Sequence, residues 1–124
     1  MLPAPIQPAD ALYVVGHWLL EQRRFADALH VFRTMLVSAP GDERGWLGLG
    51  ASHEELGNDG VAAGLYALGE AAIPTSFRCS LAHARVLRRL MNDHADAAFE
   101  RAEERALEVD DGTASAIAHE RRAA

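Results

Sequence analysis

Cysteine is almost absent from this sequence, which contains only Cys79. A single cysteine excludes an internal disulfide and indicates a reducing compartment. No apolar run approaches the roughly 20 residues that a transmembrane helix needs. The first ten residues, MLPAPIQPAD, also lack the basic start and apolar stretch of a signal peptide. We therefore expect a cytoplasmic protein that does not insert into a membrane.

Aromatic and basic residues are also scarce. Only 6% of the residues are aromatic. The chain has 12 Lys and Arg against 18 Asp and Glu, which gives a net charge of -6. This balance argues against a nucleic-acid partner, which would require a basic face. Hydrophobic residues still make up 49% of the 124 residues, enough for one domain with a buried core. That core must be built largely from Ala, Leu and Val, and Ala and Leu favour helix.

Motifs for catalysis or metal binding are missing as well. The six histidines include no H-E-x-x-H pattern. Cys79 and His83 lie four residues apart, but two ligands do not make a structural zinc site. The sequence shows neither a base for Cys79 nor a reason for a lowered thiol pKa. We therefore predict no enzyme, no catalytic residue, no metal ion and no cofactor.

Glycine, in contrast, is concentrated in one stretch, GWLGLGASHEELG, over residues 45–57. A phosphate-binding loop would follow a strand and open a helix. Here PGDE precedes the glycines and predicts a turn with Asp42 as a helix N-cap, and no Lys-Ser/Thr pair follows. The other interpretation is a helix in which the glycines permit close packing, since glycine costs about 1 kcal/mol relative to alanine in a helix.

An internal repeat supports the helical interpretation. Shifting the chain against itself by about 34 residues places Gly16 on Gly50, Ala28 on Ala62 and Pro40 on Pro74 without a gap. Trp-x2-Leu-Gly, then Ala-x3-aromatic, then Pro is the tetratricopeptide pattern. The second unit fills it with Trp46, Leu49, Gly50, Ala62, Tyr66 and Pro74. We predict an all-α tetratricopeptide-repeat solenoid of three helix-turn-helix repeats.

The predicted organisation places the repeats near 9–42, 43–76 and 77–111. A flexible leader, 1–8, precedes them, and a short capping helix or frayed tail, 112–124, follows them. Six repeat helices are expected near 9–22, 25–38, 43–56, 59–72, 77–90 and 93–108. Gly50 then lies where one helix of a pair crosses its neighbour, whereas the generic repeat gives no reason for Gly48.

The first helix of each pair lines the concave face of such a solenoid. Positions on these helices that face away from the Leu-Gly packing side predict a peptide-binding groove. They are Tyr13, Val14, His17, Leu20, Arg44, Leu47, Ala51, Glu54, Arg78, Leu81, Arg85 and Arg88. The groove is expected to be apolar at the first repeat and basic at the third. For Tyr13 and Leu20, the alternative that they fill a helix interface stays open.

Several stretches resemble one family, the small tetratricopeptide chaperones of type III secretion that serve translocator proteins. GWLGLGASHEELG is similar to that family's second-repeat helix, with Gly48, Gly50 and Ala51 in place. ALYVVGHWLLEQRRFADALHVF resembles the first repeat, with Tyr13 at a groove tyrosine, and LYALGEA resembles the following segment. The resemblance covers about residues 11–108. It departs at RCSLAHARVL, where Arg85 replaces a usual acidic residue. The family commonly has an N-terminal helix that mediates dimers, and here only about ten residues stand before the first repeat.

This resemblance implies a cytoplasmic chaperone. Such a protein binds an extended segment of a hydrophobic translocator client in its concave groove and keeps it soluble before export. A homodimer stays open. The alternatives are a chaperone of a needle or early-export subunit and a generic peptide-binding scaffold. The carboxylate-clamp type of scaffold needs Lys, Asn and Arg at groove positions, where the first repeat offers Asp10, Tyr13 and His17.

Overall fold

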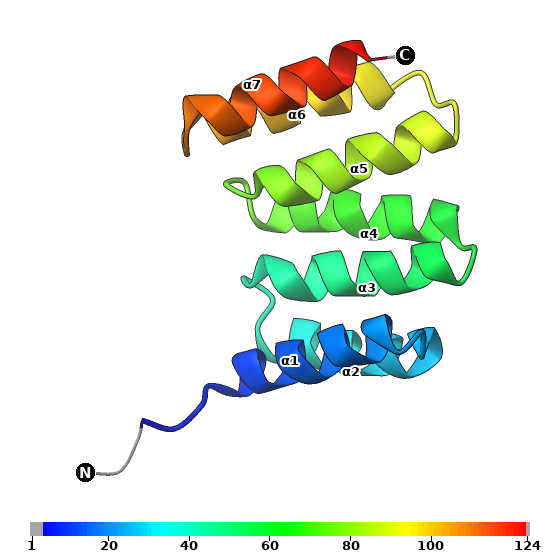
Figure 1. Ribbon diagram of the computed structural model, residues 1–124, viewed down its shortest axis with the longest axis vertical. Coiled ribbons are helices and arrows are strands. Elements are labelled where there is room, and N and C mark those ends of the chain that lie inside the picture. Colours follow the sequence, from blue (N-terminus) through cyan, green and yellow to red (C-terminus); the bar gives the residue numbers. More distant parts are fainter. Residues whose placement is uncertain (1–3, 124) are drawn as a thin grey trace.

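The computed structural model describes residues 4–123, and within this range the chain forms seven α-helices and no strand. Successive helices pack as antiparallel neighbours in a single stack that runs from the N-terminus to the C-terminus (Figure 1). The helices are α1 (Pro8–Glu21), α2 (Phe25–Ser38), α3 (Glu43–Glu55), α4 (Asp59–Ala72), α5 (Phe77–Arg89), α6 (Ala95–Leu107) and α7 (Asp111–Arg122).

The predicted fold class is confirmed: α1 to α6 form three helix pairs, and α7 packs on α6 as a short C-terminal helix. Residues 1–3 of the expected leader and residue 124 of the expected tail lie outside the described residues. None of the helices between residues 4 and 123 combines the length and apolar character that crossing a bilayer requires.

Side-chain caps define where several helices begin. The Asp42 carboxylate accepts a hydrogen bond from the Arg44 N–H at 3.0 Å, as the sequence predicted for the start of α3. The Ser76 hydroxyl accepts one from the Cys79 N–H at 3.1 Å and starts α5. Asp110 accepts one from the Thr113 N–H at 2.7 Å. This cap satisfies the N-terminus of α7, and the buried Ala114, Ile117 and Ala118 pack the tail as a helix on α6.

The glycines accommodate aromatic rings from neighbouring helices. Phe32 of α2 is 1% exposed and its ring lies against Gly16 of α1 and Gly48 of α3. A Cβ at Gly16 would lie 2.7 Å from the ring, and one at Gly48 would overlap it. Tyr66 of α4 occupies the corresponding space beside Gly50. The close packing predicted at Gly50 is confirmed, and Phe32 supplies the reason for Gly48.

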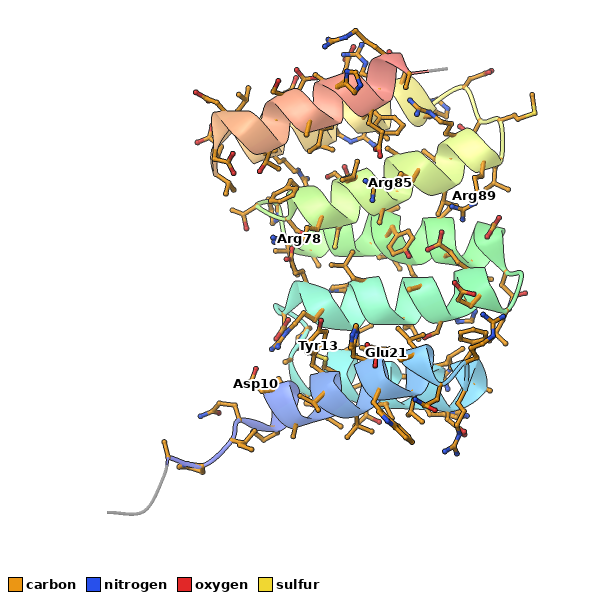
Figure 2. All side chains as sticks on the ribbon, in the orientation of Figure 1. Asp10, Tyr13, Glu21, Arg78, Arg85 and Arg89 are labelled. Carbon is orange, nitrogen blue, oxygen red and sulfur yellow. The ribbon has the colours of Figure 1, made fainter. Side chains whose placement is uncertain are left out.

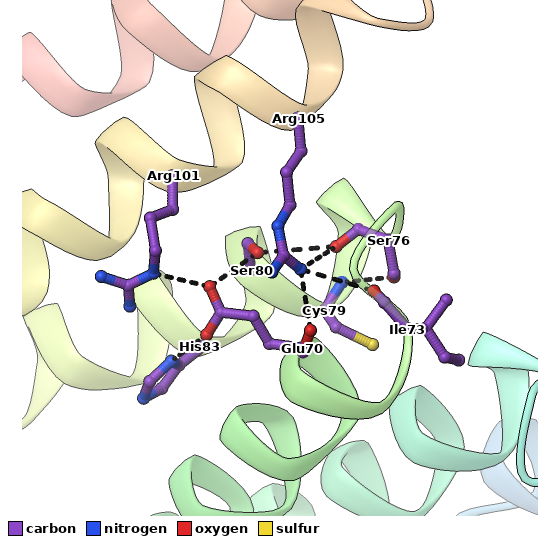
Figure 3. A network of polar contacts seen from close by, with 8 residues as sticks. All are labelled: Glu70, Ile73, Ser76, Cys79, Ser80, His83, Arg101 and Arg105. Atoms are coloured by element: carbon purple, nitrogen blue, oxygen red, sulfur yellow. Dashed lines mark hydrogen bonds and ion pairs between the residues drawn. The ribbon is translucent and has the colours of Figure 1, made fainter.

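A buried carboxylate joins α4, α5 and α6 (Figure 3). Glu70 is 7% exposed and accepts hydrogen bonds from Ser80 Oγ at 2.8 Å and Arg101 Nε at 2.7 Å. Its second oxygen lies 3.0 Å from His83 Nδ1. Burial alone would raise the pKa of Glu70, but hydrogen bonds from His83, Arg101 and Ser80 outweigh it and lower the pKa to about 2. The carboxylate is therefore fully satisfied in its charged form.

Candidate peptide-binding groove

A cavity of about 470 Å³ opens on the face formed by the first helices of the repeats. Three of these helices contribute to it: α1, α3 and the first turn of α5. We call it the main cavity, and the surface formed by α1, α3, α5 and α7 the groove face. The main cavity is lined by Tyr13, His17, Leu20, Phe32, Glu43, Arg44, Leu47, Gly48, Ala51 and Arg78. Seven of the twelve predicted groove residues are brought together here.

Apolar side chains surround the cavity on three helices. Leu20 comes from α1, and Leu47 and Ala51 come from α3. Phe32 reaches the cavity from α2, in the second layer, because Gly48 has no side chain to separate them. Sequence reasoning missed Phe32 and Gly48 as cavity residues, since an aromatic residue on the second helix of a repeat predicts core. The unexplained Gly48 was the available signal.

Tyr13 forms one wall of the cavity. Its ring stacks on His17 with a centroid separation of 5.7 Å, and the Arg44 guanidinium carbon lies 4.8 Å from the ring centroid. His17 is itself within 3.0 Å of a Glu21 oxygen. Tyr13 and Leu20 are both half-buried, pack on the α1–α2 core and line the cavity. Each side chain therefore belongs to the helix interface and to the groove face.

Carboxylates neutralise both arginines of the cavity. Arg44 donates to Asp42 at 2.7 Å and to Asp10 of α1 at 2.8 Å. These partners raise the pKa of Arg44, and the Arg44 hydrogen bonds hold the pKa of Asp42 below its ordinary value against the effect of burial. Arg78 donates to Glu43 at 3.0 Å. Figure 2 shows Asp10, Tyr13 and Arg78 on the groove face.

Arg85 and Arg89 of the third repeat are paired with carboxylates too, so the groove end that was expected to be basic also carries acidic side chains. Arg85 donates to both oxygens of Glu120 on α7, with distances of 2.9 to 3.1 Å. Arg89 pairs with Glu54 of α3 and lies 3.3 Å from Asp59. The sequence pattern missed these partners because each lies on a different helix, 30 to 35 positions away.

Glu54, Leu81 and Arg85 lie outside the main cavity. Glu54 and Ala51 line an adjoining hollow of about 360 Å³. Glu54 also accepts a hydrogen bond of 2.5 Å from the Tyr66 hydroxyl. The burial of Tyr66 raises the pKa of its hydroxyl, and this hydrogen bond raises it further. Leu81 and Arg85 line a hollow of about 230 Å³ between α5 and α7.

Arg88 and Val14 are not at any of these hollows. Arg88 lies over the Phe99 ring, 4.0 Å from its centroid, and donates to the carbonyls of Glu120 and Arg121 at 3.0 and 2.9 Å. It therefore holds the last turn of α7. Val14 is 65% exposed on the end face of α1. The equivalent of Val14 in the second repeat is Gly48, which faces back toward the first repeat. In the same register, Val14 faces away from the second repeat and therefore away from the cavity between the two.

Nothing in the described part of the chain gathers three or more His, Cys, Asp or Glu side chains into a group that could hold a metal ion. Cys79 is fully buried, and burial raises the pKa of its thiol. The pKa shift is the opposite of the one an activated thiolate requires. The groove face offers apolar walls at Leu20, Leu47 and Phe32 beside polar groups held by ion pairs.

Comparison with known proteins identifies the fold. No protein-family profile and no curated protein matches the sequence. Among solved structures, PcrH from Pseudomonas aeruginosa superposes with a TM-score of 0.78 at 24% identity, covering 98% of this chain and 96% of PcrH. The chain has the fold of the type III secretion translocator chaperones. Like them it is an all-helical repeat protein, and Yersinia enterocolitica SycD among these neighbours is a translocator chaperone.

Two further neighbours have been solved with partners. Yersinia enterocolitica SycD, in complex with a peptide of the translocator YopD, has a TM-score of 0.71 at 22% identity over 91% of this chain and 94% of that one. The TPR2B domain of yeast Sti1, in a complex with Hsp70, has a TM-score of 0.80 at 19% identity over 90% and 91%. The same fold therefore accompanies two kinds of partner.

Proposed function

We propose that the chain is a cytoplasmic type III secretion chaperone. It binds an extended segment of a hydrophobic translocator client on its groove face and keeps the client soluble before export. The observation that carries this proposal is the cavity of about 470 Å³ with apolar walls. It lies on a fold shared with PcrH, which has been solved with the chaperone binding region of PopB at a TM-score of 0.81 and 22% identity.

The cavity fits a peptide side chain better than a reacting substrate. Leu20, Leu47 and Phe32 offer apolar contacts, and burial of an apolar side chain contributes about 1.5–3 kcal/mol. Tyr13 adds a flat amphipathic surface at the edge, fixed in place by His17 and Arg44. An extended segment places alternate side chains on the same side, so it can insert one here and continue along α3 and α5.

A carboxylate-clamp scaffold is the alternative that the Sti1 neighbour brings forward. The chain contains 12 arginines and no lysine, and the cavity arginines, Arg44 and Arg78, already bind carboxylates. These contacts favour an apolar client segment over a terminal carboxylate. A chaperone of a needle or early-export subunit would differ from a translocator chaperone only in the protein that it binds. The experiment below distinguishes the two by identifying the bound protein.

The test is an affinity pull-down of tagged protein from its native cytoplasm, with the bound proteins identified by mass spectrometry. The test variant is Tyr13→Ala with Leu47→Glu, which removes one wall and places a charge in the cavity. The matched control is Leu68→Glu, because Leu68 is 58% exposed on α4, outside the cavity. Circular dichroism checks that all three proteins keep their helical content.

We expect wild type and Leu68→Glu to retain a hydrophobic secreted protein that the double variant loses. Recovery of a small export-apparatus subunit would instead support the needle or early-export alternative. Equal retention by all three proteins would place the client elsewhere and contradict the groove.

A further inference from the structure

The two arginines at the main cavity both already have carboxylate partners. Arg44 is held by Asp42 and Asp10, and Arg78 by Glu43. A carboxylate on a peptide would therefore meet charges that are already neutralised. The decisive question is how firmly each of these acids is fixed.

Glu43 is fixed through both of its oxygens. Oε1 accepts from Arg78 Nη1 at 3.0 Å, and Oε2 accepts from the Ser76 hydroxyl at 2.6 Å. Ser76 is itself 3% exposed and caps α5 through the Cys79 N–H. The Glu43 side chain is 25% exposed and lines the cavity. Because the buried Ser76 hydroxyl and Arg78 each hold one oxygen, the Glu43 carboxylate is fixed in place on the cavity wall.

Arg78 depends on this one carboxylate. Among the described residues Glu43 is its only ion-pair partner, and its guanidinium carbon otherwise lies 4.7 Å from the Phe77 ring centroid. Arg44, in contrast, has two acidic partners, and Asp42 contacts it through two donors. Removing one acid therefore has different consequences for the two arginines: Arg78 loses its partner, whereas Arg44 keeps one.

We infer that Glu43 is a specificity-determining residue, which makes the main cavity reject acidic peptide segments and select uncharged apolar ones. A peptide carboxylate near Arg78 would have to displace Glu43 or lie beside it, and like charges at close range are unfavourable. Discrimination of this kind works by disfavouring the wrong ligand and not only by attracting the right one. The inference rests on the proposed function, because it assumes that the cavity binds a peptide.

The test is an array of immobilised decapeptides of Leu, Pro and Ser in which selected serines are replaced by Asp or by Lys. It is probed with wild type, Glu43→Gln and Asp10→Asn at low and high salt. Both substitutions remove one negative charge from the groove face. Only Glu43→Gln leaves Arg78 without a carboxylate, so Asp10→Asn controls for net charge. The side-chain amide that Glu43→Gln introduces retains an acceptor for the Ser76 hydroxyl.

Wild type and Asp10→Asn are expected to bind neutral peptides better than acidic ones. Glu43→Gln is expected to bind acidic peptides about fivefold more tightly than wild type at low salt, the scale of an exposed ion pair. This gain should disappear at high salt because solvent ions screen the new pair.

Three results would overturn the inference alone. Preference of wild type for acidic peptides would show that Glu43 does not exclude them. An equal gain for Glu43→Gln and Asp10→Asn would reduce the effect to net charge. Unchanged binding of acidic peptides by Glu43→Gln, with neutral peptides still bound, would remove Glu43 as the determinant and leave the groove intact. Capture of no peptide by any of the proteins would instead overturn the proposed function together with the inference.

Discussion

Phe32 connects the core to the groove face because two facing positions carry no side chain. Its ring lies against Gly16 and Gly48, which belong to consecutive first helices. Each glycine weakens its own helix by about 1 kcal/mol relative to alanine. The buried ring offsets this cost through its apolar contacts. The composition of α3 therefore follows from what α2 inserts beside it.

Gly48→Leu is expected to lower the free energy of unfolding by about 2 kcal/mol and to close the main cavity. A Cβ at Gly48 would overlap the Phe32 ring, and overpacking a core costs about 1–3 kcal/mol. Gly64→Ala is the matched control, because a Cβ at Gly64 would meet nothing within 4 Å. This control should raise the free energy of unfolding by up to about 1 kcal/mol. Urea unfolding measures both, and an unchanged value for Gly48→Leu would contradict the packing account.

Met91 occupies a backbone conformation that favours glycine. Its φ is 54°, and Gly57, in the equivalent turn of the preceding repeat, has a φ of 80°. The Met91 side chain is 90% exposed, so its loss removes little packing. Met91→Gly is therefore expected to raise the free energy of unfolding by about 1 kcal/mol, seen as a higher Tm. Gly57→Ala should lower it, and the same sign for both variants would show that backbone conformation is not responsible.

At the scale of the helices, Glu70 provides a polar junction between the second and third repeats. The equivalent position in the first repeat is Leu36, which packs on Gly45 of α3. Glu70 instead holds Ser80 and His83 of α5 and Arg101 of α6 (Figure 3). One junction is thus apolar and the other depends on a charge.

This charge makes stability sensitive to acid. The pKa of Glu70 is lowered from an ordinary 4.5 to about 2 in the folded chain. A lowered carboxyl pKa stabilises the folded state above the ordinary pKa, and the contribution is lost as the pH falls through the folded pKa. We expect about 3 kcal/mol to be lost between pH 4.5 and pH 2.

Glu70→Gln should flatten the pH dependence of the free energy of unfolding in this range. The control is Glu104→Gln, because Glu104 is an exposed glutamate on α6. Denaturant unfolding at a series of pH values measures the slope. A slope as steep in Glu70→Gln as in wild type would assign the acid sensitivity to other carboxylates.

The helices themselves were predictable from sequence, whereas the polar contacts between them were not. The repeat period and the cap at Asp42 placed the repeat helices close to their observed bounds. The period identifies which positions face a neighbour, but not which atom lies opposite. The sequence therefore does not predict that Glu70 is buried, because a glutamate in a helix is ordinarily solvent-exposed. Predicting the pairing of Arg85 with Glu120 would have required knowing where α7 packs.

For the whole molecule, the two ends of the stack differ in character. One face of α1 is apolar and exposed, and Trp18 on it is 50% exposed. This face consists of Ala11, Val14, Val15 and Trp18. The equivalent face of α3 packs on the preceding repeat. The exposed positions of α7 include Ser115, His119 and Arg122. Because an apolar face does not pair with a polar one, head-to-tail stacking is disfavoured and α1-to-α1 pairing is favoured.

We therefore expect a symmetric dimer through α1, and expect Trp18→Glu to be a monomer. Size-exclusion chromatography with light scattering over a range of concentrations measures the mass. Leu68→Glu is the control, since it places the same charge on an exposed position of α4. A wild-type mass that stays at 13.4 kDa at every concentration would contradict the pairing.

The central claim is that the groove face holds the client. The most direct measurement is amide NMR of labelled protein, recorded with and without the client segment recovered in the pull-down. The account predicts shifts concentrated at Tyr13, Leu20, Leu47 and Ala51, around the main cavity. Shifts confined to exposed positions of α4, such as Val61 and Leu68, would contradict it.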